Sequence, residues 1–161
     1  MKGSASHRGV YNQDMNAAEL YDADFAEWTR QNAELLRSGR VAEADLARIA
    51  EEIEDMGKRE RRSLYSRMRQ LIEHLLKWQY RPERRNSTWR RTIVMHRLGI
   101  GRLLRDNPSF QPLLEDVVSQ SYQLASKTAA LATNCPRERF PQTCPYTLEQ
   151  LLDLNFLPEG P

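Results

Sequence analysis

The chain lacks the features by which several classes of protein are recognised. None of its 161 residues belongs to an apolar run near the ~20 residues that a membrane-spanning helix requires. The first ten residues also lack the apolar stretch of a signal peptide. We therefore expect a cytoplasmic protein that does not span a membrane. Strand-like alternation of polar and apolar residues is missing too, which favours an all-α fold.

Cysteine is scarce, with only Cys135 and Cys144 in the chain. Their spacing matches neither C-x-x-C nor a zinc-ribbon pattern, so it is a poor signal for a metal. A disulfide between them is geometrically possible, but a reducing cytoplasm favours two unpaired thiols. The sequence therefore predicts no cofactor at the cysteines.

Motifs of the common catalytic classes are absent as well. The chain has no G-x-S-x-G, no Walker loop and no H-E-x-x-H. Gly99 and Gly101 start a pattern like a dinucleotide fingerprint, but Leu104 stands where the third glycine is needed. We interpret the two glycines as a surface for close helix packing, and no catalytic residue is assigned.

Apolar residues recur at helical spacing along most of the chain. This spacing predicts a bundle of about four main helices: one from Asp22 or Asp24 to Gly39, a long second helix over 42–80, and others over 87–106 and 108–132. Thr147 and Gln150 form a capping box that opens a short C-terminal helix. We expect a flexible segment over 1–20, a single helical domain over 21–157 and a tail over 158–161.

Large apolar residues at steps of three or four positions are expected to form the core. The predicted core residues are Trp28, Ile53, Met56, Leu71, Trp78 and Trp89.

Charge is strongly segregated, although the formal net charge is only +2. Residues 10–57 hold 12 acidic and 4 basic side chains, whereas residues 58–105 hold 15 basic and 3 acidic ones. Such segregation can mark a nucleic-acid surface. It can equally mean that acidic helices dock against basic ones, within the fold or between subunits, and we favour this second reading.

Two histidines are the best candidates for a metal site. If the second and third helices form an antiparallel hairpin that turns near position 84, His74 and His96 lie within about one turn of each other. Two neutral imidazoles and a carboxylate would suit a first-row transition metal. The alternatives are a hydrogen-bonded core pair, which is the more common role, and an acid–base or pH-sensitive pair.

The predicted hairpin end combines cations with two tryptophans, as proteins that bind single-stranded nucleic acid do. The candidate nucleic-acid-binding residues are Lys77, Arg81, Arg84, Arg85, Arg90 and Arg91. The alternative is that Trp78 and Trp89 point inward and join the two helices, with arginine packed over their faces.

Several sequence blocks resemble a bacterial family of domains of unknown function, number twenty-nine in that series. They are Y-D-x-D-F-x-x-W at 21–28, E-E-I-E-D-M-G at 51–57, H-L-L-K-W-Q-Y-x-P-E at 74–83, S-x-W-R at 87–90 and C-P-Y-T-L-E-Q at 144–150. The resemblance implies a helical fold and a bacterial cytoplasmic setting, but no activity, ligand or partner.

The leading hypothesis from the sequence is a non-enzymatic protein-interaction module, with a second copy of the chain as one possible partner. A nucleic-acid-binding protein and a metal-dependent enzyme centred on His74 and His96 are the alternatives.

Overall fold

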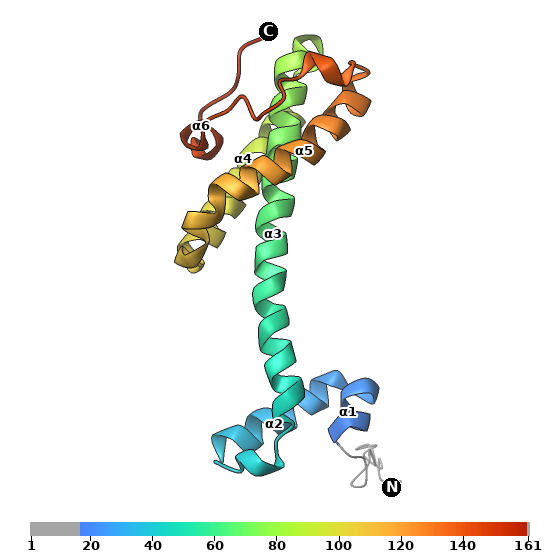
Figure 1. The fold of residues 1–161 in the computed structure, drawn as a ribbon, viewed down its shortest axis with the longest axis vertical. Helices are drawn as coiled ribbons and strands as arrows, with labels where there is room; N and C mark the ends of the chain where they lie inside the picture. Colours follow the sequence, from blue (N-terminus) through green and yellow to red (C-terminus); the bar gives the residue numbers. More distant parts are fainter. Residues whose placement is uncertain (1–16, 161) are drawn as a thin grey trace, which may run out of the picture. The chain divides into compact units, whose positions relative to one another are not determined.

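The computed structural model describes residues 17–160, and over this range the chain is built from α-helices and short 3-10 helices with no β-strand (Figure 1). This confirms the predicted all-α class. The four main helices are α2 (Phe25–Arg37), α3 (Leu46–Tyr80), α4 (Ser87–Asp106) and α5 (Leu114–Thr133). The short C-terminal helix is α6 (Leu148–Leu152). Within the described range, no helix has the length and apolar character needed to cross a membrane.

Local capping explains where several helices begin. The Asp24 side chain accepts a hydrogen bond from the backbone N–H of Glu27 at 3.0 Å, and thereby caps α2. Asn86 caps α4 in the same way, accepting from the N–H of Trp89 at 2.9 Å. These side chains satisfy backbone donors that have no partner inside the helix.

Three element boundaries differ from the prediction. Helix α1 (Ala17–Ala23) begins inside the segment that was expected to be flexible, whose residues 1–16 lie outside the described range. Helix α3 starts at Leu46 rather than near 42, because residues Val41–Glu43 form the 3-10 helix η1. Residues Pro108–Leu113 form the 3-10 helix η3 rather than the first turns of α5, in keeping with prolines that cannot donate backbone hydrogen bonds.

The chain divides into two compact units, one ending at Asp55 and the other beginning at Met56. In the second unit, α4 and α5 lie beside the C-terminal half of α3 (Figure 1). Leu71 is buried in the core of this unit, and Trp78 is half-buried against it. Other fully buried side chains of that core are Leu64, Met68, Ile72, Leu75, Ile93, Ile100, Val117, Tyr122 and Leu151.

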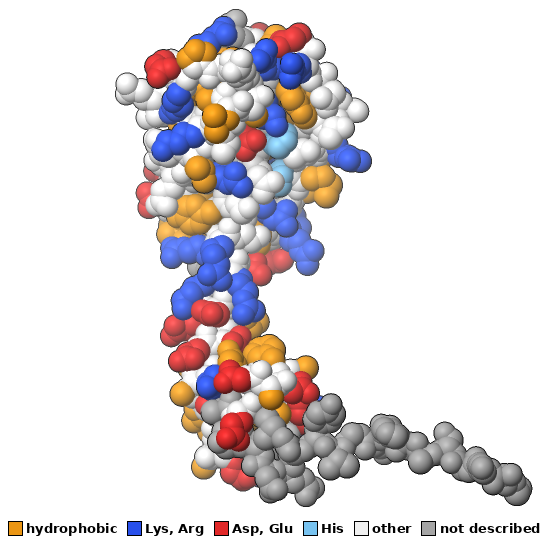
Figure 2. All heavy atoms as spheres, turned by 90° about the vertical axis from the view of Figure 1, so that its right-hand side faces the viewer, with side chains coloured by type: hydrophobic (Ala, Val, Ile, Leu, Met, Phe, Trp, Pro, Cys, Tyr) orange, Lys and Arg blue, Asp and Glu red, His pale blue; other side chains and the backbone are white. Residues whose placement is uncertain are grey.

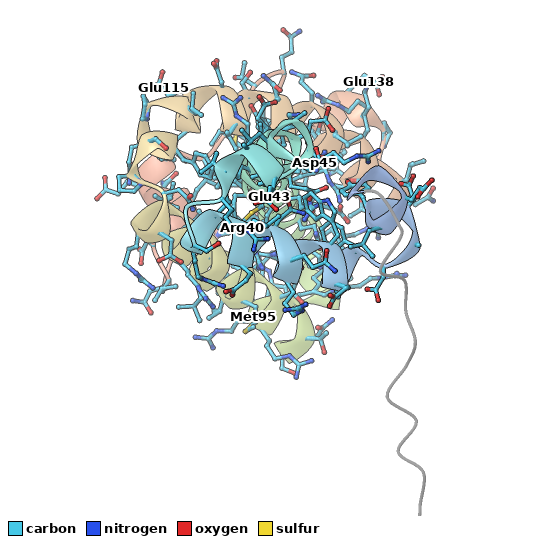
Figure 3. All side chains as sticks on the ribbon, turned by 90° about the horizontal axis from the view of Figure 1, so that it is seen from below. Arg40, Glu43, Asp45, Met95, Glu115 and Glu138 are labelled. Atoms are coloured by element: carbon cyan, nitrogen blue, oxygen red, sulfur yellow. The ribbon has the colours of Figure 1, made fainter. Side chains whose placement is uncertain are left out.

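The first unit holds α1, α2, η1 and the first turns of α3. The Asn32 side chain accepts a hydrogen bond from the backbone N–H of Asp45 at 2.8 Å, which joins α2 to the start of α3. Arg40 and Glu43 form an ion pair at 3.0 Å beside this junction (Figure 3). Trp28 is buried in this unit, as its place on the apolar stripe suggested.

Two of the predicted core residues are not in a core. Ile53 is 64% exposed and Met56 is 62% exposed, so placing them inside was wrong. In the first unit, the side of α3 that contacts α1 is not the side that carries Ile53. Tyr21 contacts Arg48 and Glu52, which lie to one side of the stripe that carries Ile53.

Candidate functional site

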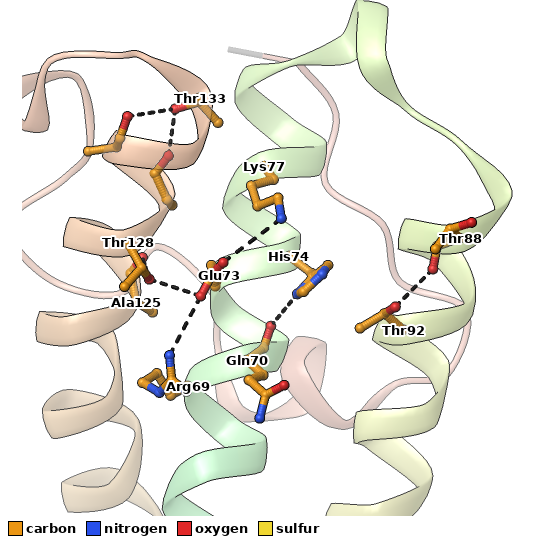
Figure 4. Close-up of polar contacts among 12 residues, drawn as sticks. Arg69, Gln70, Glu73, His74, Lys77, Thr88, Thr92, Ala125, Thr128 and Thr133 are labelled. Atoms are coloured by element: carbon orange, nitrogen blue, oxygen red, sulfur yellow. Dashed lines mark hydrogen bonds and ion pairs between the residues drawn. The ribbon is translucent and has the colours of Figure 1, made fainter.

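His74 and His96 lie side by side on the second unit. Their ring centroids are 6.5 Å apart and the ring planes are tilted by 40°. His74 projects from α3 toward α4, which carries His96 (Figure 4). The pale-blue histidine side chains are visible at the surface, with lysine and arginine side chains nearby (Figure 2). The antiparallel register inferred from the sequence therefore predicted this proximity correctly.

A backbone carbonyl determines the tautomer of His74. Its Nδ1 lies 2.9 Å from the carbonyl oxygen of Gln70, one turn earlier in α3. Since a carbonyl oxygen can only accept, Nδ1 carries the hydrogen and Nε2 carries the lone pair. Burial lowers the pKa of His74, and Lys77 acts in the same direction, although the Gln70 hydrogen bond and Glu73 oppose them. The ring is therefore neutral at pH 7.

His96 has an unusual nitrogen. Its Nδ1 is buried and has no hydrogen-bond partner among the described residues. Burial is the largest cause that lowers the pKa of this ring, followed by the repulsion that a protonated His74 would exert and by the charges of Arg67 and Arg69. The pair is thus two neutral imidazoles, and one of them has an unsatisfied buried atom.

Glu73, which precedes His74 in α3, makes contacts on another side of the helix. Glu73 accepts a hydrogen bond from the Thr128 hydroxyl at 2.9 Å, on the side of α3 that faces α5 (Figure 4). It also pairs with Arg69 at 3.7 Å and with Lys77 at 3.9 Å. Over residues 17–160, no cluster of three or more histidine, cysteine or acidic side chains could hold a metal ion. The third ligand that the sequence hypothesis required is therefore not brought to the histidines.

Intramolecular contacts occupy half of the predicted nucleic-acid-binding cations. Arg81 pairs with Glu83 at 3.0 Å and donates a hydrogen bond to the carbonyl oxygen of Thr133. Arg85 Nε donates to the carbonyl oxygen of Trp78 at 2.8 Å. Lys77 forms an ion pair with Glu73. The exposed members of the set are Arg84, Arg90 and Arg91.

The two tryptophans of the hairpin end are half-buried and already carry cations on their faces. Lys77 Nζ lies 5.2 Å from the centroid of the Trp89 ring. The Arg85 guanidinium lies 5.3 Å from the centroid of Trp78. A ring face covered in this way is not free to stack on a base, so the arrangement favours the packing interpretation.

Arg97 is an important residue that sequence reasoning missed. Its side chain is buried, and its guanidinium donates to the carbonyl oxygens of Leu151 at 2.9 Å, Phe156 at 2.7 Å and Gln150 at 3.1 Å. It thereby holds α6 and the following segment against α4. Nothing in the sequence distinguishes it from the other arginines of the basic segment.

Both cysteines are unpaired, as the sequence predicted. Cys144 lines a pocket of about 340 Å³ beside α5, together with Val118, Tyr122, Tyr146 and Leu148. Burial raises the pKa of the Cys144 thiol. The thiol is therefore protonated at neutral pH, which is the unreactive form.

The first unit carries several exposed large hydrophobic side chains, one of which, Ile53, was predicted to lie in the core. Tyr21, Phe25 and Trp28 form an aromatic cluster, with the Phe25 and Trp28 rings stacked at 5.7 Å. Trp28 is the only large hydrophobic side chain that is fully buried among residues 19–55. Over the same range, the exposed large hydrophobic residues are Phe25, Leu36, Val41, Leu46 and Ile53.

Comparison with known proteins gives the family. The family model described as "Domain of unknown function DUF29" matches residues 20–157, which is most of the chain. The chain belongs to this family. No curated protein and no solved structure matched it. The description of DUF29 names no reaction or ligand, so the function has to be argued from the geometry.

The blocks that carry the DUF29 resemblance have clear structural roles in this chain. Asp24 caps α2, and Trp28 is buried in the first unit. Thr147 and Gln150 cap α6 reciprocally: the Gln150 side chain accepts from the N–H of Thr147 at 3.0 Å, and the Thr147 hydroxyl accepts from the N–H of Gln150 at 3.2 Å. These motif residues help to build the fold.

Proposed function

We propose that this DUF29 chain is a non-enzymatic protein-interaction module, and that its first unit packs against a second copy of the chain. The observation that carries the proposal is an imbalance among residues 19–55, where five large hydrophobic side chains are exposed and only one, Trp28, is buried. Large apolar side chains that gather on one exposed surface mark interaction sites in proteins.

The size of the first unit supports the same conclusion. The unit spans Met1–Asp55, and a domain of about 60 residues buries only about 60% of its unfolded surface, which makes it marginally stable alone. This unit contains no cysteine. Association with another protein surface would supply the missing burial.

Charge complementarity favours a second copy as the partner. The acidic excess of residues 10–57 is followed by the basic excess of residues 58–105. Exposed arginines of the basic segment, among them Arg61 and Arg62, offer an oppositely charged surface to the acidic unit of another copy. A two-fold arrangement would form this contact twice.

A single charge in the apolar surface tests the proposal. Ile53→Asp replaces an exposed side chain, so the fold of the monomer is retained, but in the dimer it buries a carboxylate without a partner. We expect the dimer dissociation constant, measured by sedimentation equilibrium, to rise at least about tenfold, which corresponds to about 1.4 kcal/mol.

Leu131→Asp is the matched control. Leu131 is 84% exposed on α5, in the second unit, and makes no part of the proposed interface. We expect this variant to associate like the wild type. Equal dissociation constants for the wild type and Ile53→Asp, with unchanged helicity by circular dichroism, would contradict the proposal.

A further inference from the structure

The hydrogen bond of His74 leaves one nitrogen of its ring with a lone pair that can bind a metal ion. In metal sites, a coordinating histidine typically donates its other ring N–H to a carbonyl or carboxylate oxygen, which orients the ring. His74 has this arrangement, because its Nδ1 bonds to the Gln70 carbonyl and leaves Nε2 on the side of α4.

The unsatisfied nitrogen of His96 gives a second, independent indication. Its buried Nδ1 carries either a hydrogen that no acceptor receives or a lone pair that no donor fills. A buried polar atom without a hydrogen-bond partner destabilises the folded state. Coordination to a metal ion would fill the lone pair and remove that destabilisation.

The spacing of the rings is compatible with one shared ion. A metal–nitrogen bond of about 2.0–2.1 Å places the ion about 3.2 Å from a ring centroid. Two imidazoles on opposite sides of one ion therefore have centroids about 6.4 Å apart, close to the observed 6.5 Å. A smaller nitrogen–metal–nitrogen angle requires a shorter distance between the ring centroids. Rotation of the two side chains can provide that shorter distance.

The surrounding charges restrict the kind of ion. Glu73 is paired with Arg69 and Lys77, so it partly neutralises both. Arg67 crosses α4 at Gly99, where a Cβ atom would lie 2.8 Å from the Arg67 Cζ. Calcium and magnesium prefer oxygen ligands, whereas both protein ligands of the pair are ring nitrogens. Imidazole suits copper, zinc and nickel.

We propose that His74 and His96 form a binding site for an imidazole-preferring transition-metal ion, with copper favoured over zinc, between α3 and α4. Water or a small anion beside Arg67 completes the coordination. The site lies within one chain and is independent of the association of the first unit.

Metal titration of the untagged full-length protein, freed of metal with a chelator, tests the site. With Cu²⁺ and Zn²⁺ as probes and isothermal titration calorimetry as the readout, we expect one ion per chain and tighter binding of Cu²⁺. Mg²⁺ should give no binding. His74→Gln and His96→Gln should each abolish metal binding, because only one of the two imidazole ligands remains.

The third histidine of the chain supplies the matched control, since His7→Gln should retain full binding. Electron paramagnetic resonance of the copper-loaded wild type gives a readout that needs no variant, and it should show coupling to two imidazole nitrogens. The proposal is overturned by half an ion per chain, by binding that survives in both single variants, by loss of binding in His7→Gln, or by coupling to a single nitrogen.

Discussion

Arg97 donates to the carbonyl oxygens of Gln150, Leu151 and Phe156 from a buried position on α4. Arg97→Met keeps much of the side-chain volume but leaves these acceptors without their donor. We expect the free energy of unfolding, measured by urea denaturation, to fall by about 3 kcal/mol or more. We also expect faster proteolysis after α6.

Arg90→Met is the control for that substitution. Arg90 lies on the same helix but is exposed, so its replacement should change the free energy of unfolding by no more than about 0.5 kcal/mol. If both variants lose the same stability, Arg97 does not hold the C-terminal segment in the way described.

Tyr122 makes the protein sensitive to alkaline pH. Burial raises its pKa to about 12, and its hydroxyl donates to the carbonyl oxygen of Pro141 at 2.6 Å. In the unfolded chain a tyrosine ionises near pH 10, so the unfolded state loses its proton first as the pH rises. Stability should therefore be intact below about pH 10 and decline from there toward pH 12.

Tyr122→Phe tests this account. At neutral pH we expect a loss of about 1 kcal/mol from the missing hydrogen bond. Above about pH 10 the stability of the variant should decline less steeply than that of the wild type, because one titrating group is gone. Urea midpoints from pH 8 to pH 11 measure both effects. An unchanged alkaline slope would show that Tyr122 is not the responsible group.

At the scale of elements, two glycines should respond in opposite directions to the same change. Gly39 follows α2 with φ of +75°, a left-handed conformation that costs an alanine about 1 kcal/mol. Gly57 lies inside α3, where alanine is about 1 kcal/mol more favourable. A Cβ at either position meets no described atom within 4 Å, so the backbone alone decides.

We therefore expect Gly39→Ala to lower the thermal unfolding midpoint and Gly57→Ala to raise it. Differential scanning calorimetry of the two variants beside the wild type measures this. A midpoint that moves in the same direction for both would mean that packing, rather than backbone conformation, controls these positions.

Elements whose signals are local could be predicted from the sequence. The Thr147–Gln150 capping box involves residues three positions apart, so it could be recognised from the sequence. The proximity of His74 and His96 also followed, because a hairpin between two long helices leaves little freedom in register.

Features that depend on the rest of the molecule could not be predicted. Periodicity showed that α3 has an apolar stripe through Ile53, but not whether another element covers it. The buried role of Arg97 depends on a segment more than 50 positions later in the chain. The hydrogen-bond state of the His96 ring likewise depends on its neighbours in space.

At the scale of the whole molecule, the segregated charges should make association depend on salt. Electrostatic screening shortens the range of charge interactions from about 10 Å at 0.1 M salt to about 3 Å at 1 M. We expect the dimer dissociation constant to increase over this range while the apolar contact keeps some dimer. Association that strengthens with salt would indicate an apolar interface without the proposed charge complementarity.

The mass of the full-length wild type in solution tests the central claim most directly. Multi-angle light scattering on material eluting from a size-exclusion column gives that mass without any variant. The account predicts a species with twice the 18.8 kDa of one chain at high concentration, dissociating on dilution. A single 18.8 kDa species up to about 100 μM, well above the micromolar affinity of a weak interface, would contradict it.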